Sequence, residues 1–133
     1  MSGKCLTPAE ANARLPLVVA VAGDAVALSA RLATVVASYR AERRRPVPSQ
    51  TLLNETKVSR DGLQRELDAC LAEMLAADAT LADPAQGIVD FRSVLDGTGI
   101  LLCWRCGEER VEHFHGEDEA HDVRRPLPEP VHA

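Results

Sequence analysis

Cysteine and histidine side chains gather near the end of the sequence, where their types and spacing suit metal chemistry. Cys103 and Cys106 form a C-x-x-C pair, and His113, His115 and His121 follow within fifteen residues. Thiolate sulfur and imidazole nitrogen are common protein ligands of zinc. The two histidines of His113-Phe114-His115 would share one face of a strand, because strand side chains alternate. The sequence therefore indicates a candidate zinc site made of Cys103, Cys106, His113, His115 and His121.

Strand alternation counts against the C-x-x-C pair as a complete motif. Residues three apart on a regular strand point to opposite faces, so both thiols reach one metal only if the chain turns at Arg105-Cys106. A single pair also supplies only two of the four ligands of a structural zinc site. A redox C-x-x-C needs a helix N-terminus, which is not predicted here. The alternative is that the histidines are ordinary surface or hydrogen-bonded groups beside an acidic tail.

A second candidate site surrounds the turn that follows Trp104. Glu108 in this turn and Arg124 in the tail are expected to form a salt bridge that pins the tail over the hairpin. Alternatively, Trp104, Glu108, His115 and Arg124 line a pocket for a small anion or other small ligand. No Gly-rich phosphate loop, Ser-His-Asp order or paired-carboxylate motif stands out. This favours a protein without enzymatic activity, although it leaves the question open.

The elements that must position these residues form a small antiparallel sheet at about residues 86–116. Residues 88–91 are expected to be a short strand, and Asp96-Gly97-Thr98-Gly99 is a strong turn signal. Residues 100–105 have the pattern of a largely buried strand, and residues 109–115 return as its partner after Gly107-Glu108. Residues 117–133 are expected to be an extended tail.

Two long helices are predicted before the sheet. Thr7-Pro8-Ala9-Glu10 is a capping box, and Pro16 is expected to end or kink the first short helix. A long helix over residues 17–45 and another from residues 49–51 to about 77 follow, each roughly 40 Å long. Apolar residues recur in each at spacings of three and four, which indicates that they pack against a neighbour. These seams are Val21, Ala25, Leu28, Leu32, Val35 and Tyr39 in the first, and Leu63, Leu67, Cys70, Met74 and Ala77 in the second.

The predicted fold is therefore α+β in a single domain, residues 1–133. A long antiparallel helical hairpin at about residues 8–77, including a short N-terminal helix, packs with the small C-terminal antiparallel β-sheet.

The motifs along the chain resemble a bacterial family catalogued as domain of unknown function 2203. The resemblance rests on Gly87-Ile88-Val89-Asp90-Phe91, Leu102-Cys103-Trp104-Arg105, Gly107-Glu108 and His115, with residues 7–12 and 15–18 before them. It implies a helical hairpin plus a small sheet and brings no established activity. His115, Arg124 and Pro126 fall where the family has histidine, arginine and proline. The family's Gly-Phe pair is replaced here by Ala120-His121, which puts in doubt any role that depends on that pair.

Composition and charge limit the partners. The net charge of −5 argues against a general nucleic-acid binder. No run of 18 apolar residues occurs, so we expect no membrane span. The apolar stretch Leu15–Ala22 lacks the basic flank and cleavage context of a signal peptide. The four cysteines suggest no disulfide framework, which fits a cytoplasmic protein.

The helices also predict a partner. Two helices of this length cannot bury all their apolar surface against each other and one small hairpin, and such surfaces usually find a partner. We therefore expect a homodimer formed through the long helices, in which two helical hairpins can pair as a four-helix bundle. The leading functional hypothesis is a dimeric interaction or scaffold module. Zinc binding and small-anion binding are the alternatives.

Overall fold

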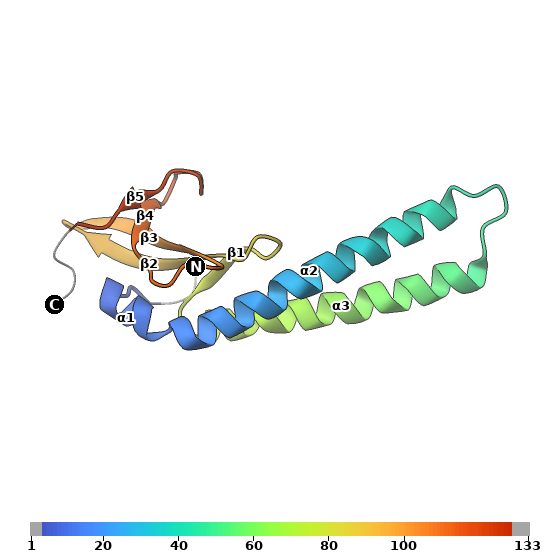
Figure 1. The fold of residues 1–133 in the computed structure, drawn as a ribbon, viewed down its shortest axis with the longest axis horizontal. Helices are drawn as coiled ribbons and strands as arrows, with labels where there is room; N and C mark the ends of the chain where they lie inside the picture. The colour runs from blue at the N-terminus through green and yellow to red at the C-terminus, as the bar shows by residue number, and fades with distance from the viewer. Residues whose placement is uncertain (1–3, 129–133) are drawn as a thin grey trace.

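A computed structural model describes residues 4–128, and its helices form a long hairpin (Figure 1). Helix α1 is Pro8–Ala13, α2 is Leu15–Arg43 and α3 is Gln50–Ala76. Thr7 and Glu10 form the predicted capping box, and the Ser49 side chain accepts the Leu52 N–H at the start of α3. The Glu42 carboxylate accepts the Ser49 N–H at 2.7 Å and so fastens the connection between α2 and α3.

The break between α1 and α2 lies at Arg14, so Pro16 stands in the first turn of α2. Proline is tolerated there because that N–H has no helical acceptor.

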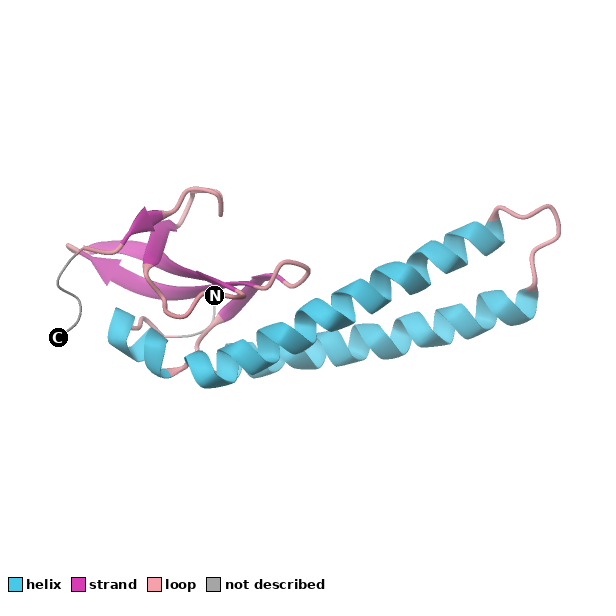
Figure 2. Ribbon diagram, in the orientation of Figure 1, coloured by secondary structure: helices cyan, strands magenta, loops and turns pink. Residues whose placement is uncertain are grey.

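Five antiparallel strands follow in the order β1-β2-β3-β4-β5 (Figure 2). Their bounds are Thr80–Asp83, Ile88–Leu95, Thr98–Arg105, His113–Gly116 and Arg125–Pro126. Each strand therefore pairs with its neighbours in the sequence, and the predicted α+β class with a C-terminal antiparallel sheet is confirmed.

The sheet is larger than the expected span of residues 86–116. β1 and β5 were not predicted. The expected strand over residues 109–115 is present as β4, but its start is wrong, because β4 begins only at His113. Residues 106–112 form a loop that is held from two sides. The Trp104 indole donates to the Glu108 carbonyl, and the Asn12 side chain accepts the Val111 N–H at 2.8 Å. Residues 117–128 are also less extended than expected, since turns lead into β5; residues 129–133 of the predicted tail lie outside the described part.

The two faces of the sheet have different partners. Val89, Phe91, Leu102 and Trp104 belong to a core cluster shared with α1, α2 and α3. Their neighbours on the opposite face include Asp90 and Cys103, which are also buried. The C-terminal segment contacts this second face, because Arg124 donates to the Cys103 carbonyl. The opposite face is therefore a buried polar layer between the sheet and the end of the chain.

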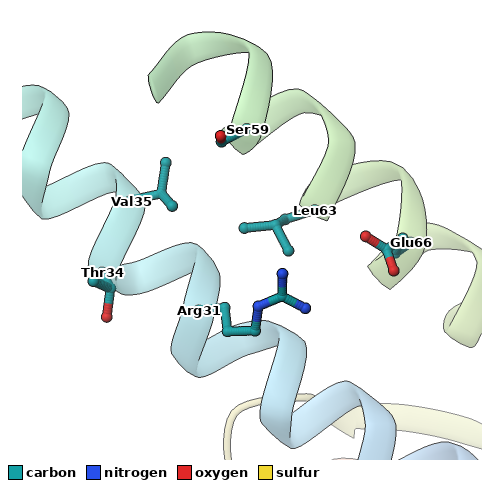
Figure 3. Close-up of a pocket in the computed structure, with 6 residues that line it drawn as sticks. All are labelled: Arg31, Thr34, Val35, Ser59, Leu63 and Glu66. Carbon is teal, nitrogen blue, oxygen red and sulfur yellow. The ribbon is translucent and has the colours of Figure 1, made fainter. Parts of the chain in front are cut away.

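The predicted seams of the two long helices face each other. Val21, Ala25 and Leu28 are buried, as are Leu63, Leu67, Cys70 and Met74. Toward the far end of the hairpin, Leu32 and Val35 are only partly buried. A shallow groove runs along one side there, lined by Arg31, Thr34, Val35, Ser59, Leu63 and Glu66 (Figure 3).

Helix α2 is unusually apolar. Among the described residues it is the one helix long and apolar enough to cross a membrane, with a mean hydropathy of 1.7 and 33% burial in its most apolar window. A core helix and a membrane-spanning helix can both have this length and hydropathy, so these values do not distinguish between them. The absence of a membrane partner stays a prediction.

Candidate functional site

Three side chains with metal-binding atoms converge in the polar layer. Asp90 on β2 pairs in register with Cys103 on β3, and cross-strand partners lie on the same face. His115 on β4 pairs with Leu101, two residues before Cys103, and therefore shares that face. One ligand atom from each of Asp90, Cys103 and His115 lies within 4.8 Å of the others, and all three residues are buried.

The His115 ring is oriented by a backbone carbonyl. Its Nδ1 lies 2.8 Å from the Gly116 oxygen. A carbonyl oxygen only accepts, so we assign the Nδ1 proton to this hydrogen bond. The other nitrogen, Nε2, faces Asp90 Oδ1 at 3.4 Å. Metal-bound histidines commonly donate their second ring N–H to a carbonyl or carboxylate, so His115 has the orientation of a metal ligand.

His121 completes the group from the C-terminal segment. Its Nε2 lies 2.8 Å from Asp90 Oδ2, and its ring meets the His115 ring edge to face with centroids 5.0 Å apart. Arg105 donates to the His121 carbonyl at 2.6 Å and holds the backbone in place. The His121 side chain is 37% exposed, against 1% for His115. His121 therefore forms the solvent side of the site.

The Cys103 thiol is held in its neutral form. Burial raises the pKa of this thiol, and the Asp90 carboxylate raises it further, against smaller opposing effects of Arg124 and Arg105. Cysteine, histidine and aspartate together have the composition of a nucleophilic catalytic group. A cysteine nucleophile, however, needs a lowered pKa and access to substrate. Cys103 is wholly buried and has neither property.

The predicted salt bridge between Glu108 and Arg124 is confirmed. Arg124 donates to both Glu108 carboxylate oxygens, at 2.6 and 2.8 Å, and the Arg105 N–H donates to the same carboxylate. Burial pushes the pKa of Glu108 upward, but the bonds from Arg124 and Arg105 outweigh it and hold this pKa below its ordinary value. The paired charges tie the C-terminal segment to the loop after β3.

The remaining sequence candidates lie outside the converging group. Cys106 is exposed beyond the end of β3, where its Sγ lies so close to Gly87 that a Cβ there would be 2.4 Å away. His113 shares the face of Cys103 through their register, and its buried Nδ1 has no hydrogen-bond partner in the described part of the chain. Trp104 lies on the opposite face, in the core. The structure therefore brings together Cys103, His115 and His121 around Asp90, and Cys106, His113 and Trp104 lie outside this group.

Asp90 is the functional candidate that sequence reasoning passed over. Two signals point to it. It is the one charged residue in the buried run Ile88-Val89-Asp90-Phe91, and a buried carboxylate requires partners. It also pairs with Cys103 once the turn at residues 96–97 sets the register between β2 and β3.

Comparison with known proteins places nearly the whole chain in one family. Residues 4–127 match the family described as "Uncharacterized conserved protein (DUF2203)". The chain belongs to this family. The resemblance inferred from the motifs is thus confirmed, and all four residues of the converging group lie within the DUF2203 match. No curated protein and no solved structure matches the chain. The description of DUF2203 names no activity, so a function must be argued from the site.

The three buried groups, Asp90, Cys103 and His115, could bind one tetrahedral metal ion after small movements. Zinc bonds of about 2.0–2.3 Å place tetrahedral ligand atoms roughly 3.3–3.8 Å apart. The distance of 3.4 Å from His115 Nε2 to Asp90 Oδ1 lies in this range already. Contacts as long as 4.8 Å among the buried ligand atoms require an inward shift of about 1 Å. His121 sits closer, at 2.8 Å from Asp90 Oδ2, and a metal bound to both would replace the proton between them.

Proposed function

We propose that this DUF2203 protein binds one divalent transition-metal ion, with zinc as the best fit, through Asp90, Cys103, His115 and His121. The observation that carries the proposal is the convergence of three buried ligand atoms within 4.8 Å, with the Gly116 carbonyl orienting one of them. His121 supplies the fourth ligand from the C-terminal segment.

The donor set favours zinc over harder cations. One sulfur and two imidazole nitrogens suit zinc, whereas Mg²⁺ and Ca²⁺ prefer oxygen ligands. The charges also balance, because the Asp90 carboxylate and a Cys103 thiolate together neutralise a divalent cation. That balance matters in a buried layer, where an uncompensated charge is costly. Bound metal would deprotonate the thiol whose pKa burial otherwise raises.

The arrangement of the ligands favours a structural role for the metal. Four protein ligands leave no coordination position for substrate, as in closed structural zinc sites. Three ligands come from separate strands, and His121 comes from the segment that follows the sheet. A metal ion would therefore tie the C-terminal segment to the sheet, beside the Glu108–Arg124 pair that already links them.

A reducing compartment such as the cytoplasm suits this proposal. The described cysteines are all free, and a thiolate ligand must stay unoxidised.

The small-anion alternative has less support. Arg124 is the natural anion-binding group of that hypothesis, but Glu108 already occupies it with two short hydrogen bonds. Trp104, another member of the proposed pocket, is buried in the core on the opposite face. The residues expected to line that pocket therefore lie on two different faces of the sheet.

Cobalt substitution tests the metal proposal with a matched pair of thiol variants. Purified protein without a histidine tag is titrated with Co²⁺, and the absorption spectrum reports tetrahedral geometry and thiolate coordination. We expect one Co²⁺ per chain and a thiolate charge-transfer band that persists in Cys106→Ser and disappears in Cys103→Ser. Cys106 is the control because it lies in the same C-x-x-C pair but outside the cluster. A folded wild-type protein that takes up no Co²⁺ would show that the cluster is held by hydrogen bonds alone.

A further inference from the structure

The exposed side of α2, which includes Ala27 and Thr34 at the edges of the grooves beside α3, has no cover within the described part of the chain. Only the inner side of this helix contributes to the core, through residues such as Val18, Ala22 and Ala25. Its outer side exposes an apolar surface that begins with Leu17 and Val19, which are 48% and 47% exposed. It continues through the exposed residues Ala20, Gly23, Ala27, Ala30, Thr34, Ala37 and Ala41. We call these nine residues the outer α2 face.

A helix that is apolar on all sides is normally covered on all sides. The exposed positions from Ala20 to Ala41 alternate in spacing between three and four, which is the period of a helix-packing seam. The predicted seam that includes Val21 and Leu28 is already buried where α2 packs against α3. The outer α2 face is thus a second seam on the same helix, available to another helix.

Charges beside this face identify the partner and its direction. Asp24 and Arg31 are both exposed, and neither forms an ion pair within residues 4–128. They are seven residues apart, or about two helical turns, so they lie on the same edge of the face. Figure 3 shows the Arg31 guanidinium extending into the groove toward Leu63 and Glu66 of α3.

Two copies of α2 packed antiparallel and centred near Ala27 bring Asp24 of each copy beside Arg31 of the other. The contact is self-complementary, as a two-fold dimer requires. Parallel packing about a two-fold axis would instead place this edge of one helix and the same edge of its copy on opposite sides of the contact, where these charges could not pair.

We propose that the outer α2 face is the interface with a second copy of this chain, packed antiparallel, with two ion pairs between Asp24 and the partner's Arg31. Small side chains on this face allow the two helix backbones to approach closely. The candidate metal site lies in the polar layer, on the face of the sheet turned away from the helices, and does not take part.

Sedimentation equilibrium of the full chain, with charge-reversal variants, tests the interface. We expect a dimer at micromolar concentration. Asp24→Arg and Arg31→Asp should each weaken it at least about tenfold, because like charges then meet twice across the two-fold axis. The double variant carrying both changes should restore the wild-type affinity, since it inverts both pairs. Glu109→Arg, the same change of sign in an exposed loop beside the sheet, should leave the dimer unchanged.

A steric variant provides an independent readout. Nothing lies within 4 Å of a Cβ placed at Gly23, so a single chain accommodates a larger side chain there. Gly23→Leu should therefore keep the helical circular dichroism of the wild type but lose dimerisation. A wild type that stays monomeric would overturn the proposal, as would a dimer that Gly23→Leu and Asp24→Arg leave intact. A monomer that co-sediments with phospholipid vesicles would overturn it too, by assigning the face to lipid.

Discussion

Zinc should raise the melting temperature of the wild-type protein by about 10 °C when it is present at roughly one hundred times its dissociation constant. Binding to the folded state alone contributes about 2.7 kcal/mol at that ratio. One kcal/mol corresponds to roughly 4 °C in a chain of this size. The effect is expected because the four proposed ligands come together only when the strands and the C-terminal segment are folded. Differential scanning calorimetry with and without zinc measures it.

The histidine variants make this prediction specific. In His115→Ala the zinc-dependent rise should vanish, whereas in His113→Ala it should persist, although both residues lie on β4 and share one face. Because His115 is buried, its replacement also lowers stability without zinc, so the comparison is between zinc-dependent shifts. His121→Ala, at a partly exposed position, should fold normally and show a reduced shift. Equal shifts in His113→Ala and His115→Ala would contradict the assigned ligand set.

Trp104→Ala should destabilise the protein by about 3–5 kcal/mol in urea unfolding, as large-to-small changes of buried aromatic residues do. Trp104 is 1% exposed and contacts the core, and its indole N–H donates to the Glu108 carbonyl at 2.9 Å. Trp104→Phe should recover most of the loss because it restores apolar volume and omits only the hydrogen bond.

The prediction for Trp104 separates a core residue from a ligand-binding residue. Leu75→Ala is the control, since Leu75 is 42% exposed and its truncation should cost well under 1 kcal/mol. A Trp104→Ala protein with nearly wild-type stability would contradict a core role for this side chain. It would instead support the alternative that Trp104 lines a binding pocket.

Local sequence signals were sufficient for most of the fold. The capping box at Thr7 and Glu10, the heptad spacing of both long helices and the Asp96-Gly97 turn each act within a few residues of chain. Their outcome therefore does not depend on distant contacts. The antiparallel pairing of β2 with β3 followed from that turn.

The missed strands depend on long-range pairing. β1 has four residues and β5 has two, too few to show an alternating pattern. β1 exists because it extends the edge of β2, and β5 exists because the C-terminal segment returns to β4. Short edge strands of this kind are decided by the sheet they join rather than by their own residues.

The candidate site was predictable only in part for the same reason. The histidines and Cys103 were proposed from residue type, and Cys106 lies in the turn after β3, outside the converging group. Asp90 could be recognised as a candidate only once the β2–β3 register was known. The placement of His121 likewise depends on the path of the C-terminal segment across the sheet. Neither is encoded by spacing within a motif. The sequence therefore indicated which kinds of side chain could bind a metal, but the proposed set of ligands required the three-dimensional structure.

X-ray absorption at the zinc edge, on zinc-loaded wild-type protein, is the most direct measurement of the ligand set. The account predicts a four-coordinate ion with one sulfur at about 2.3 Å and three nitrogen or oxygen ligands at about 2.0–2.1 Å. Two sulfurs would mean that Cys106 joins the site, and a shell without sulfur would exclude Cys103. Either result, or protein that retains no zinc after dialysis, would contradict the proposed centre.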